Sequence, residues 1–246
     1  MTRLKIRSDN FYMEIRYFEN RDELYAVASK HFEQAVANGA RTFGLATGGT
    51  MEPLYENLRN SDVDFSACTS FNLDEYAGID KQSEHSYYTY MHEQLFNTKP
   101  FAQSFVPVGD VEDLTAAARE YEDMLQANER DIQLLGVGAN GHIAFNEPGT
   151  AFDSVTHVIE LTPSTREANA RFFSSIDEVP THAVTMGIAS ILHAKEIVLI
   201  ACGENKREAM EALVDGEVTV DVPVSVLNNH PNVIVYTDLK LPVAVK

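Results

Sequence analysis

A glycine-rich stretch near the middle of the chain, LLGVGANGHIAFNEPG (134–149), contains three polar side chains that suit acid–base chemistry: Asn140, His142 and Glu147. An imidazole titrates near neutral pH, and a nearby amide or carboxylate can orient it. The alternative is a packed histidine beside a solvated carboxylate, which is the usual fate of a single His or Glu. Three polar groups in one glycine-rich loop favour a functional site.

The glycines of this stretch, Gly136, Gly138 and Gly141, have the G-x-G-x-x-G spacing of a dinucleotide-binding turn and follow the apolar run DIQLL. Such a turn must open a helix, because the helix N-terminus holds the pyrophosphate. Pro148 and Gly149 follow Gly141 too soon for a helix of useful length. We therefore expect a loop beyond a strand end that presents its polar side chains, and no nucleotide site.

Two adjacent carboxylates, Asp74 and Glu75, follow the apolar run SFNL. One of them could cap the next segment by accepting backbone N–H groups. The other interpretation is a general base, whose pKa partial burial raises towards the operating pH. The local sequence leaves both interpretations open.

The turn TGGT, formed by Thr47, Gly48, Gly49 and Thr50, lies between a short apolar strand and a helix. Its glycines allow backbone N–H groups to turn inward, and the helix N-terminus adds positive potential. The turn could therefore hold a phosphate, although no lysine follows as in a Walker loop. The alternative is a tight turn with a threonine cap.

Two cations stand where helices are expected to begin, Arg166 in STREANARFF and Lys206 in GENKREA. A positive charge there opposes the helix dipole, so a bound anion would explain both positions. Solvated surface residues are the alternative. The tyrosine-rich segment 85–96 is either core or a lid, and the scattered histidines do not have the spacing of a metal site.

The elements that position these residues follow from the periodicity of apolar residues. We predict strands at 11–18, 41–46, 66–73, 131–138, 156–161, 196–203 and 232–238, helices at 21–39, 51–59, 85–96, 112–128, 164–173 and 204–216, and a strand running into a helix at 183–194. The helix at 164–173 opens with the capping-box spacing S-x-x-E. Buried strands that alternate with helices predict an α/β fold with a mostly parallel central sheet covered on both faces, with ligands beyond the carboxyl ends of the strands.

The composition and charge of the chain limit the classes of function that it can have. The chain has 246 residues and a formal net charge of −18, from 37 acidic and 19 basic residues. This field repels nucleic acid and anionic membranes, so an anionic substrate needs a local cationic site. Cys68 and Cys202 lie in apolar runs and indicate buried thiols in a reducing compartment. With no membrane span or signal peptide, we expect one cytoplasmic domain over residues 1–246, without nucleic-acid or membrane partners.

Six motifs together resemble the glucosamine-6-phosphate deaminase family, in order and spacing, from about residue 12 to 238: LATGGT, FNLDEY, SYYTYMH, GHIAFNEPG, TREANARFF and AVTMGIASIL. The resemblance implies a Rossmann-like three-layer αβα fold. It also implies conversion of glucosamine 6-phosphate and water into fructose 6-phosphate and ammonia, with no metal or organic cofactor.

The resemblance also implies residue roles. His142 opens the sugar ring, with Asn140 and Glu147 orienting it, and Asp74 moves the proton from C2 to C1. The phosphate is held by TGGT, Arg166 and Lys206, and its binding energy positions the reacting carbons.

Two departures from the family pattern matter. Asn140 stands where many longer members have aspartate and others have asparagine, so an amide replaces one carboxylate beside His142; we expect activity to survive. Allosteric members carry basic residues after the NEP motif, whereas THVIELT places His157 and Ile159 there, and the C-terminal tail is short. The resemblance is therefore to the short, non-allosteric type, and we expect no activation by N-acetylglucosamine 6-phosphate. The sequence leaves the oligomeric state open.

Two alternatives share this fold: a 6-phosphogluconolactonase, which needs no C2 base, and a non-catalytic sugar-phosphate sensor of the kind found in transcription regulators. The paired FNLDEY and GHIAFNEP motifs favour the deaminase, and the acidic charge and a sheet that begins near Phe11 count against a DNA-binding sensor.

Overall fold

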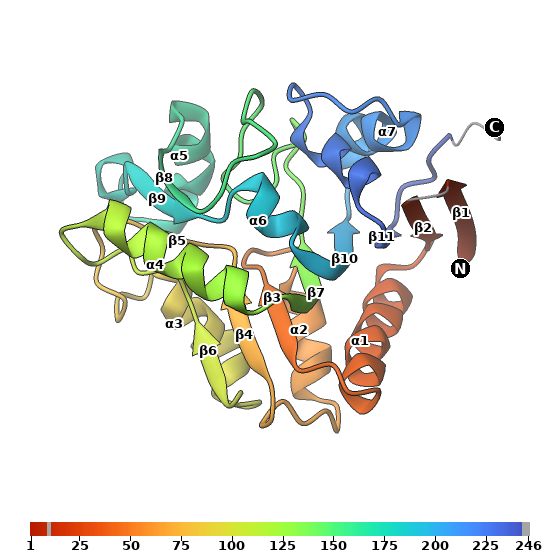
Figure 1. The fold of residues 1–246 in the computed structure, drawn as a ribbon, viewed down its shortest axis with the longest axis horizontal. Helices are drawn as coiled ribbons and strands as arrows, with labels where there is room; N and C mark the ends of the chain where they lie inside the picture. The colour runs from red at the N-terminus through yellow and green to blue at the C-terminus, as the bar shows by residue number, and fades with distance from the viewer. Residues whose placement is uncertain (9–10, 243–246) are drawn as a thin grey trace.

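A computed structural model describes residues 1–8 and 11–242. Its centre is an eight-stranded sheet with the order β1-β2-β11-β10-β7-β3-β4-β6 (Figure 1). The strands are β1 (Thr2–Ser8), β2 (Phe11–Tyr17), β3 (Thr42–Leu45), β4 (Thr69–Asn72), β6 (Gln103–Phe105), β7 (Arg130–Leu135), β10 (Ala194–Ala201) and β11 (Val233–Thr237). Only the β1–β2 pair is antiparallel, so the predicted α/β fold with a mostly parallel sheet is confirmed.

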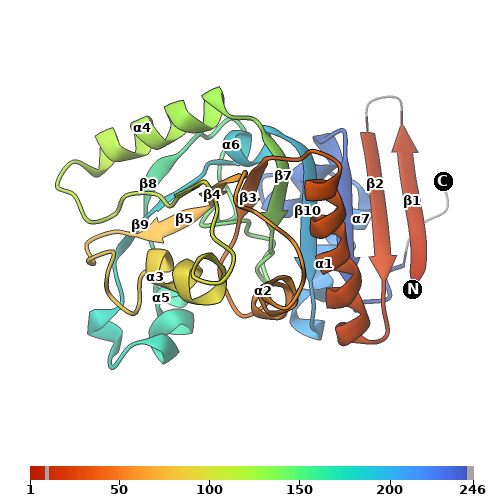
Figure 2. The same ribbon diagram turned by 90° about the horizontal axis from the view of Figure 1, so that it is seen from below.

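Helices cover both faces of this sheet (Figure 2). One face carries α1 (Arg21–Ala37), α2 (Glu52–Arg59) and α3 (Tyr87–Met91), which continues as a π-helical turn over His92–Phe96; the other carries α4 (Leu114–Ala127) and α6 (Ile188–Leu192). The central strands β7, β10 and β11 are buried almost throughout, which explains their continuous apolar runs. The three layers therefore follow from the strand–helix alternation of the sequence.

A second sheet was not foreseen. Its antiparallel strands are β8 (His157–Glu160), β9 (His182–Thr185) and β5 (Asp74–Tyr76), in the order β5-β9-β8. The prediction that the strands near 156–161 and 183–186 belong to the parallel sheet was therefore wrong. The backbone N–H of Met186, just after β9, donates to Leu73 O at 2.8 Å. This hydrogen bond ties the end of β9 to Leu73, the residue that joins β4 to β5.

Several predicted boundaries also change. The sheet begins at Thr2, not near Phe11, because β1 adds an edge strand to β2. Helix α5 (Pro163–Asn169) is capped by Thr162, whose side chain accepts from the Thr165 N–H, so the capping box at Ser164 is absent. Pro163 takes the first helical position, where no donor is needed.

The two thiols are free, but only Cys68 is buried; Cys202 is partly exposed where β10 ends. None of the helices in the described residues has the length and apolarity needed to cross a membrane.

Candidate active site

The loops that carry the predicted site residues leave neighbouring strands at one edge of the sheet. Strands β4, β3, β7 and β10 are adjacent and parallel, so their carboxyl ends lie side by side. This edge lies at the top of Figure 1, between α5 and α7 (Arg207–Asp215). The polar loop residues therefore meet where parallel α/β sheets bind ligands.

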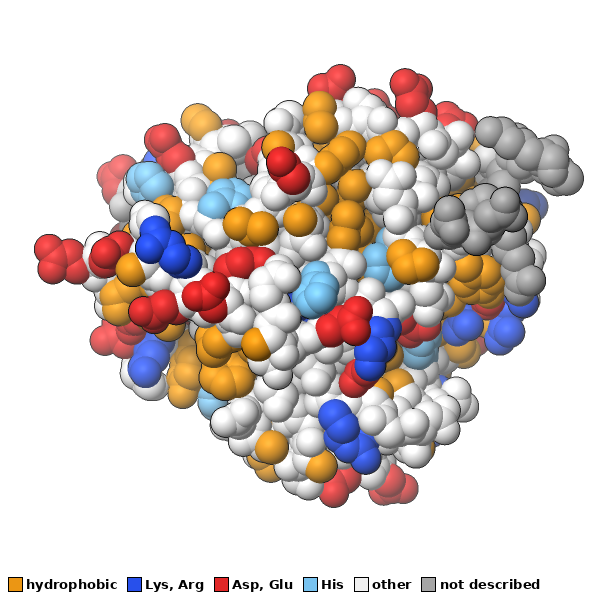
Figure 3. Space-filling view, viewed as in Figure 1, with side chains coloured by type: hydrophobic (Ala, Val, Ile, Leu, Met, Phe, Trp, Pro, Cys, Tyr) orange, Lys and Arg blue, Asp and Glu red, His pale blue; other side chains and the backbone are white. Residues whose placement is uncertain are grey.

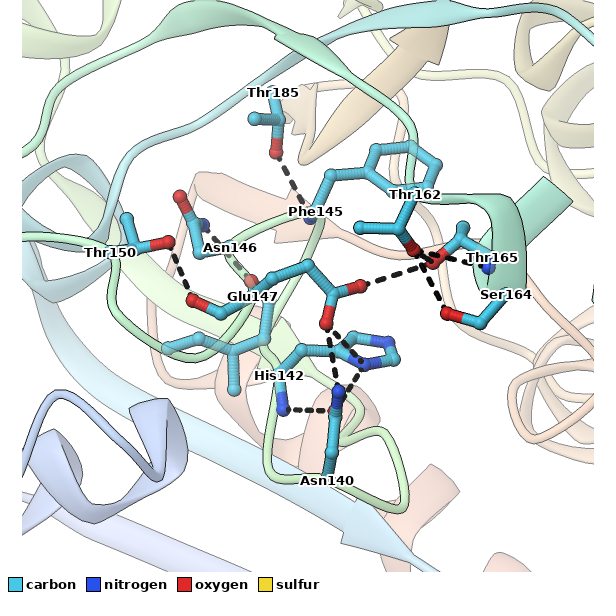
Figure 4. A network of polar contacts seen from close by, with 11 residues as sticks. Asn140, His142, Phe145, Asn146, Glu147, Thr150, Thr162, Ser164, Thr165 and Thr185 are labelled. Carbon is cyan, nitrogen blue, oxygen red and sulfur yellow. Dashed lines mark hydrogen bonds and ion pairs between the residues drawn. The ribbon is translucent and has the colours of Figure 1, made fainter.

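The loop after β7 folds without a helix, as the proline in its sequence predicts. The Asn146 amide donates to the carbonyls of Ile143 and Met186, both at 2.9 Å. The Phe145 N–H donates to Thr185 Oγ1 at 3.2 Å, as Figure 4 shows. Ala144 is the one described non-glycine residue with positive φ, at 50°. A strained backbone held by buried hydrogen bonds is typical of a loop that positions functional side chains.

Asn140 joins Glu147 to His142 (Figure 4). Its Nδ2 donates to Glu147 Oε2 at 2.8 Å, and its Oδ1 lies 2.7 Å from His142 Nδ1. A carboxylate only accepts, so the amide nitrogen must face Glu147 and the amide oxygen must face the ring. Because an amide oxygen also only accepts, Nδ1 carries the proton and Nε2 keeps its lone pair. The arrangement leaves Nε2 of His142 available to accept a proton.

His142 lies in a tight and partly buried position, with its side chain 35% exposed. A Cβ on Gly138 would lie 2.0 Å from the ring atom Cε1, so only glycine leaves room for the imidazole. Burial lowers the pKa of His142; the negative charge of Glu147, 3.7 Å from Nδ1, opposes this shift, and the positive charge of Lys206 adds to it. The imidazole is therefore held neutral near pH 7.

The structure separates the two carboxylates after β4. Glu75 accepts N–H groups from Tyr76, Tyr87 and Tyr88 at 2.8 to 2.9 Å, so it caps the start of α3. Asp74 is 8% exposed, and its carboxylate has no hydrogen-bond partner within residues 1–8 and 11–242. Burial, with a contribution from the Glu75 charge, raises the pKa of Asp74 to about 8. Glu75 therefore has the capping role, and Asp74 has the properties of a general base.

The turn 47–50 is exposed around its glycines. Tyr90 donates its hydroxyl to Gly48 O at 2.9 Å, and Tyr25 donates to Thr50 O at 2.7 Å, so two tyrosines hold the turn by its carbonyls. Gly48 has a φ of 106°, and a Cβ on Gly48 or Gly49 would meet open space. Tyr90 therefore supports the turn. At this residue the 85–96 segment, predicted to be either core or lid, packs against the turn.

The two predicted cations differ in their surroundings. Lys206 is the N-cap of α7 and is half buried, and its side-chain ammonium makes no hydrogen bond or ion pair with any described residue. Burial lowers its pKa. Arg166 instead donates from one terminal nitrogen to Ile176 O at 3.1 Å and Val179 O at 3.0 Å, and its buried Nε has no partner in the described chain. Lys206 is therefore the cation left free beside His142, whereas Arg166 is turned towards its own segment.

One contact was missed by the sequence analysis. Thr165, in α5, donates its hydroxyl to Glu147 Oε1 at 3.1 Å. The two residues are 18 positions apart, and a threonine in a first helical turn is common, so no local pattern indicated the contact.

Side chains of both signs lie on the face of the molecule that Figure 3 shows. Acidic side chains are spread over the face shown in Figure 3 and outnumber the basic ones, in line with the net charge of −18. The free ammonium of Lys206 at the sheet edge is therefore a local positive charge in a generally negative electrostatic field.

Comparisons with known proteins agree with this architecture. The family model described as "Glucosamine-6-phosphate isomerases/6-phosphogluconolactonase" matches residues 19–235. A glucosamine-6-phosphate deaminase from Lysinibacillus sphaericus is 57% identical over 204 residues, 83% of this chain and 92% of that protein. One from Enterococcus faecalis is 50% identical over 226 residues, 92% of this chain and 97% of that protein.

A solved structure described as a monomeric glucosamine-6-phosphate deaminase superposes with a TM-score of 0.87 at 41% identity and covers 91% of this chain and 96% of its own. These similarities confirm the resemblance seen in the six motifs. The chain belongs to the family of glucosamine-6-phosphate isomerases and 6-phosphogluconolactonases.

Proposed function

We propose that this protein converts glucosamine 6-phosphate and water into fructose 6-phosphate and ammonia. The observation that carries the proposal is the pairing of two separate acid–base groups at one sheet edge. His142 is neutral with Nε2 unprotonated, and Asp74 is buried with its pKa raised to about 8. Ring opening and enolisation each need such a group, because the C2 proton becomes acidic only in the open-chain sugar.

Ring opening is the task of His142. Its Nε2 takes the proton of the C1 hydroxyl and returns a proton to the ring oxygen as the C1–O5 bond breaks. Asn140 keeps the proton on Nδ1, and Glu147 stabilises the transient imidazolium through its negative charge.

Isomerisation and deamination follow from Asp74. Its carboxylate removes the proton from C2 of the open-chain aldehyde while O1 takes a proton from the ammonium group of the substrate, which gives a neutral enolamine; the carboxylic acid so formed then delivers the C2 proton to C1. The product is an imine at C2, which takes up water and loses ammonia to leave the ketone of fructose 6-phosphate. A pKa near the working pH suits a group that both takes and returns a proton.

Phosphate binding falls to the turn 47–50 and Lys206. The exposed N–H groups around Gly48 and Gly49 and the free ammonium of Lys206 supply donors and charge. We include Arg166 as a phosphate ligand that must first leave the carbonyls of Ile176 and Val179. The phosphate does not react, so its binding energy serves to place C1 and C2 against Asp74.

The second candidate is lactone hydrolysis, because 6-phosphogluconolactonases share the family. A lactonase needs no base at C2, so the buried and unpaired Asp74 favours the deaminase. We further propose that the chain works as a single cytoplasmic domain without nucleic-acid or membrane partners and without allosteric activation.

The test is a product assay on the purified protein with glucosamine 6-phosphate and 6-phosphogluconolactone in parallel. We expect equimolar fructose 6-phosphate and ammonia from the first and no accelerated hydrolysis of the second. Asp74→Asn should abolish exchange of the C2 proton with solvent but still bind substrate. A folded protein that turns over neither substrate, or only the lactone, contradicts the proposal.

A further inference from the structure

Glu147 is held by two donors, one on each oxygen. Thr165 donates to Oε1 at 3.1 Å and Asn140 donates to Oε2 at 2.8 Å (Figure 4). Each hydrogen bond fixes one oxygen, so together they fix the plane of the carboxylate. Glu147 is 24% exposed, and its χ3 torsion is intrinsically soft, so without two donors the carboxylate could rotate.

The direction of the hydroxyl protons is also fixed. Thr162 Oγ1 accepts the Thr165 N–H at 3.2 Å and donates its own proton to Thr165 Oγ1 at 2.9 Å. The proton of Thr165 is therefore left for Glu147. An ordered chain of hydrogen bonds runs from the N-terminus of α5 through Thr165, Glu147 and Asn140 to Nδ1 of His142.

We infer that Thr165 is a positioning residue for His142, which it orients through the Glu147 carboxylate and the Asn140 amide. This inference rests on the proposed function. Thr165 is not placed against the sugar, and its effect depends on the amide orientation of Asn140. The Asn140 oxygen also accepts the backbone N–H of His142 at 3.1 Å, so the amide is anchored at both ends. If Glu147 rotates, Asn140 loses the anchor on its nitrogen, and its oxygen holds the proton on Nδ1 less firmly.

Thr165→Val removes the hydroxyl but keeps the shape and the β-branch of the side chain. We expect kcat for deamination to fall about tenfold while KM changes less than about twofold, the usual scale for a residue behind an acid–base group. Thr165→Ser retains the donor and should keep kcat within about twofold of the original. Ser164→Ala is the matched control, because Ser164 contacts Thr162 and lies outside the path from Thr165 to His142.

A second measurement does not depend on turnover. Nitrogen NMR of histidine-labelled protein, with His142→Gln to assign the signal, reports which ring nitrogen carries the proton in the absence of substrate. We expect Nδ1 to be protonated in the original protein and in Thr165→Ser, and the proton to be shared between the two nitrogens in Thr165→Val. If Thr165→Val lowers the Tm, Thr165→Ala provides the same comparison.

The outcomes separate the inference from the function it rests on. An original protein that does not deaminate its substrate contradicts the proposed function, and the NMR comparison still tests Thr165. Unchanged protonation of His142 together with an unchanged kcat in Thr165→Val overturns the inference. So does an equal loss in Thr165→Ser, because the loss then does not follow the hydroxyl.

Discussion

Asn140 lies between His142 and the Glu147 carboxylate: its nitrogen is 2.8 Å from Glu147 Oε2 and its oxygen is 2.7 Å from His142 Nδ1. The negative charge of Glu147 reaches the imidazole through an amide and over 3.7 Å rather than by a direct hydrogen bond. The amide fixes the tautomer, and the carboxylate supplies the charge.

Asn140→Asp tests this division of labour. The substitution puts a second negative charge beside His142, which favours the imidazolium and raises the pKa of His142. A base must be unprotonated, so kcat/KM falls at low pH as His142 takes up a proton. In the variant, the fall that is due to His142 should occur at higher pH. We expect the activity at pH 8 to stay within about tenfold of the original.

A full pH profile of both proteins measures this shift. An acid limb at the same pH in both proteins contradicts the role given to Asn140.

Asp74 should make activity and stability depend on pH in opposite ways. Its pKa is raised to about 8, so the charged base accumulates, and kcat/KM rises, as the pH increases towards 8. The folded protein holds this proton more tightly than the unfolded chain, so the contribution of Asp74 to stability falls between about pH 4 and pH 8.

Asp74→Asn removes the free-energy cost of burying a charged carboxylate. Above pH 8 the variant should have a Tm about 4 to 8 °C higher than the original, from about 2 kcal/mol of relieved desolvation, and no activity. The gain should shrink as the pH falls towards 4. Thermal unfolding across this range measures it, and a variant less stable than the original at pH 9 contradicts the burial of a charged Asp74.

Lys206→Met should weaken substrate binding. The half-buried ammonium makes no ion pair with a described residue, and the loss of a charge-assisted contact to phosphate should raise KM about 30-fold. Lys195→Met is the matched control. Lys195 is exposed near the start of β10, away from the site, and its ammonium lies 2.7 Å from Asp131 of β7. The same change in net charge at this position should leave KM unchanged. Equal effects from both variants would point to the general field of the protein rather than to a phosphate site.

Gly138→Ala should displace His142. The new Cβ would lie 2.0 Å from the ring, and a shift of this size in an acid–base group costs about 100-fold in kcat. Gly136→Ala, in the same loop, would place its Cβ 3.4 Å from the flexible end of Met51 and should retain most activity. Steady-state kinetics with a Tm for each variant distinguishes a displaced base from a destabilised loop.

Much of this protein was predictable because its signals are local. Strand and helix periods, and the early Pro148, predicted the α/β fold and a helix-free loop after β7. Asn140, His142 and Glu147 lie within eight residues, so their association follows from one short loop. The six motifs carried the family resemblance, since their order along the chain is itself sequence information.

Other features depended on contacts between distant segments. Glu75 caps α3 and Asp74 does not, because the N–H groups of residues 87 and 88 face only one of two adjacent carboxylates. The turn of the chain after Leu73 forms the second sheet, and a hydroxyl 18 residues away reaches Glu147. Sequence determined which groups this protein has at the sheet edge; tertiary structure decided which are satisfied by backbone partners and which are left for chemistry, because burial and hydrogen bonding belong to the assembled fold.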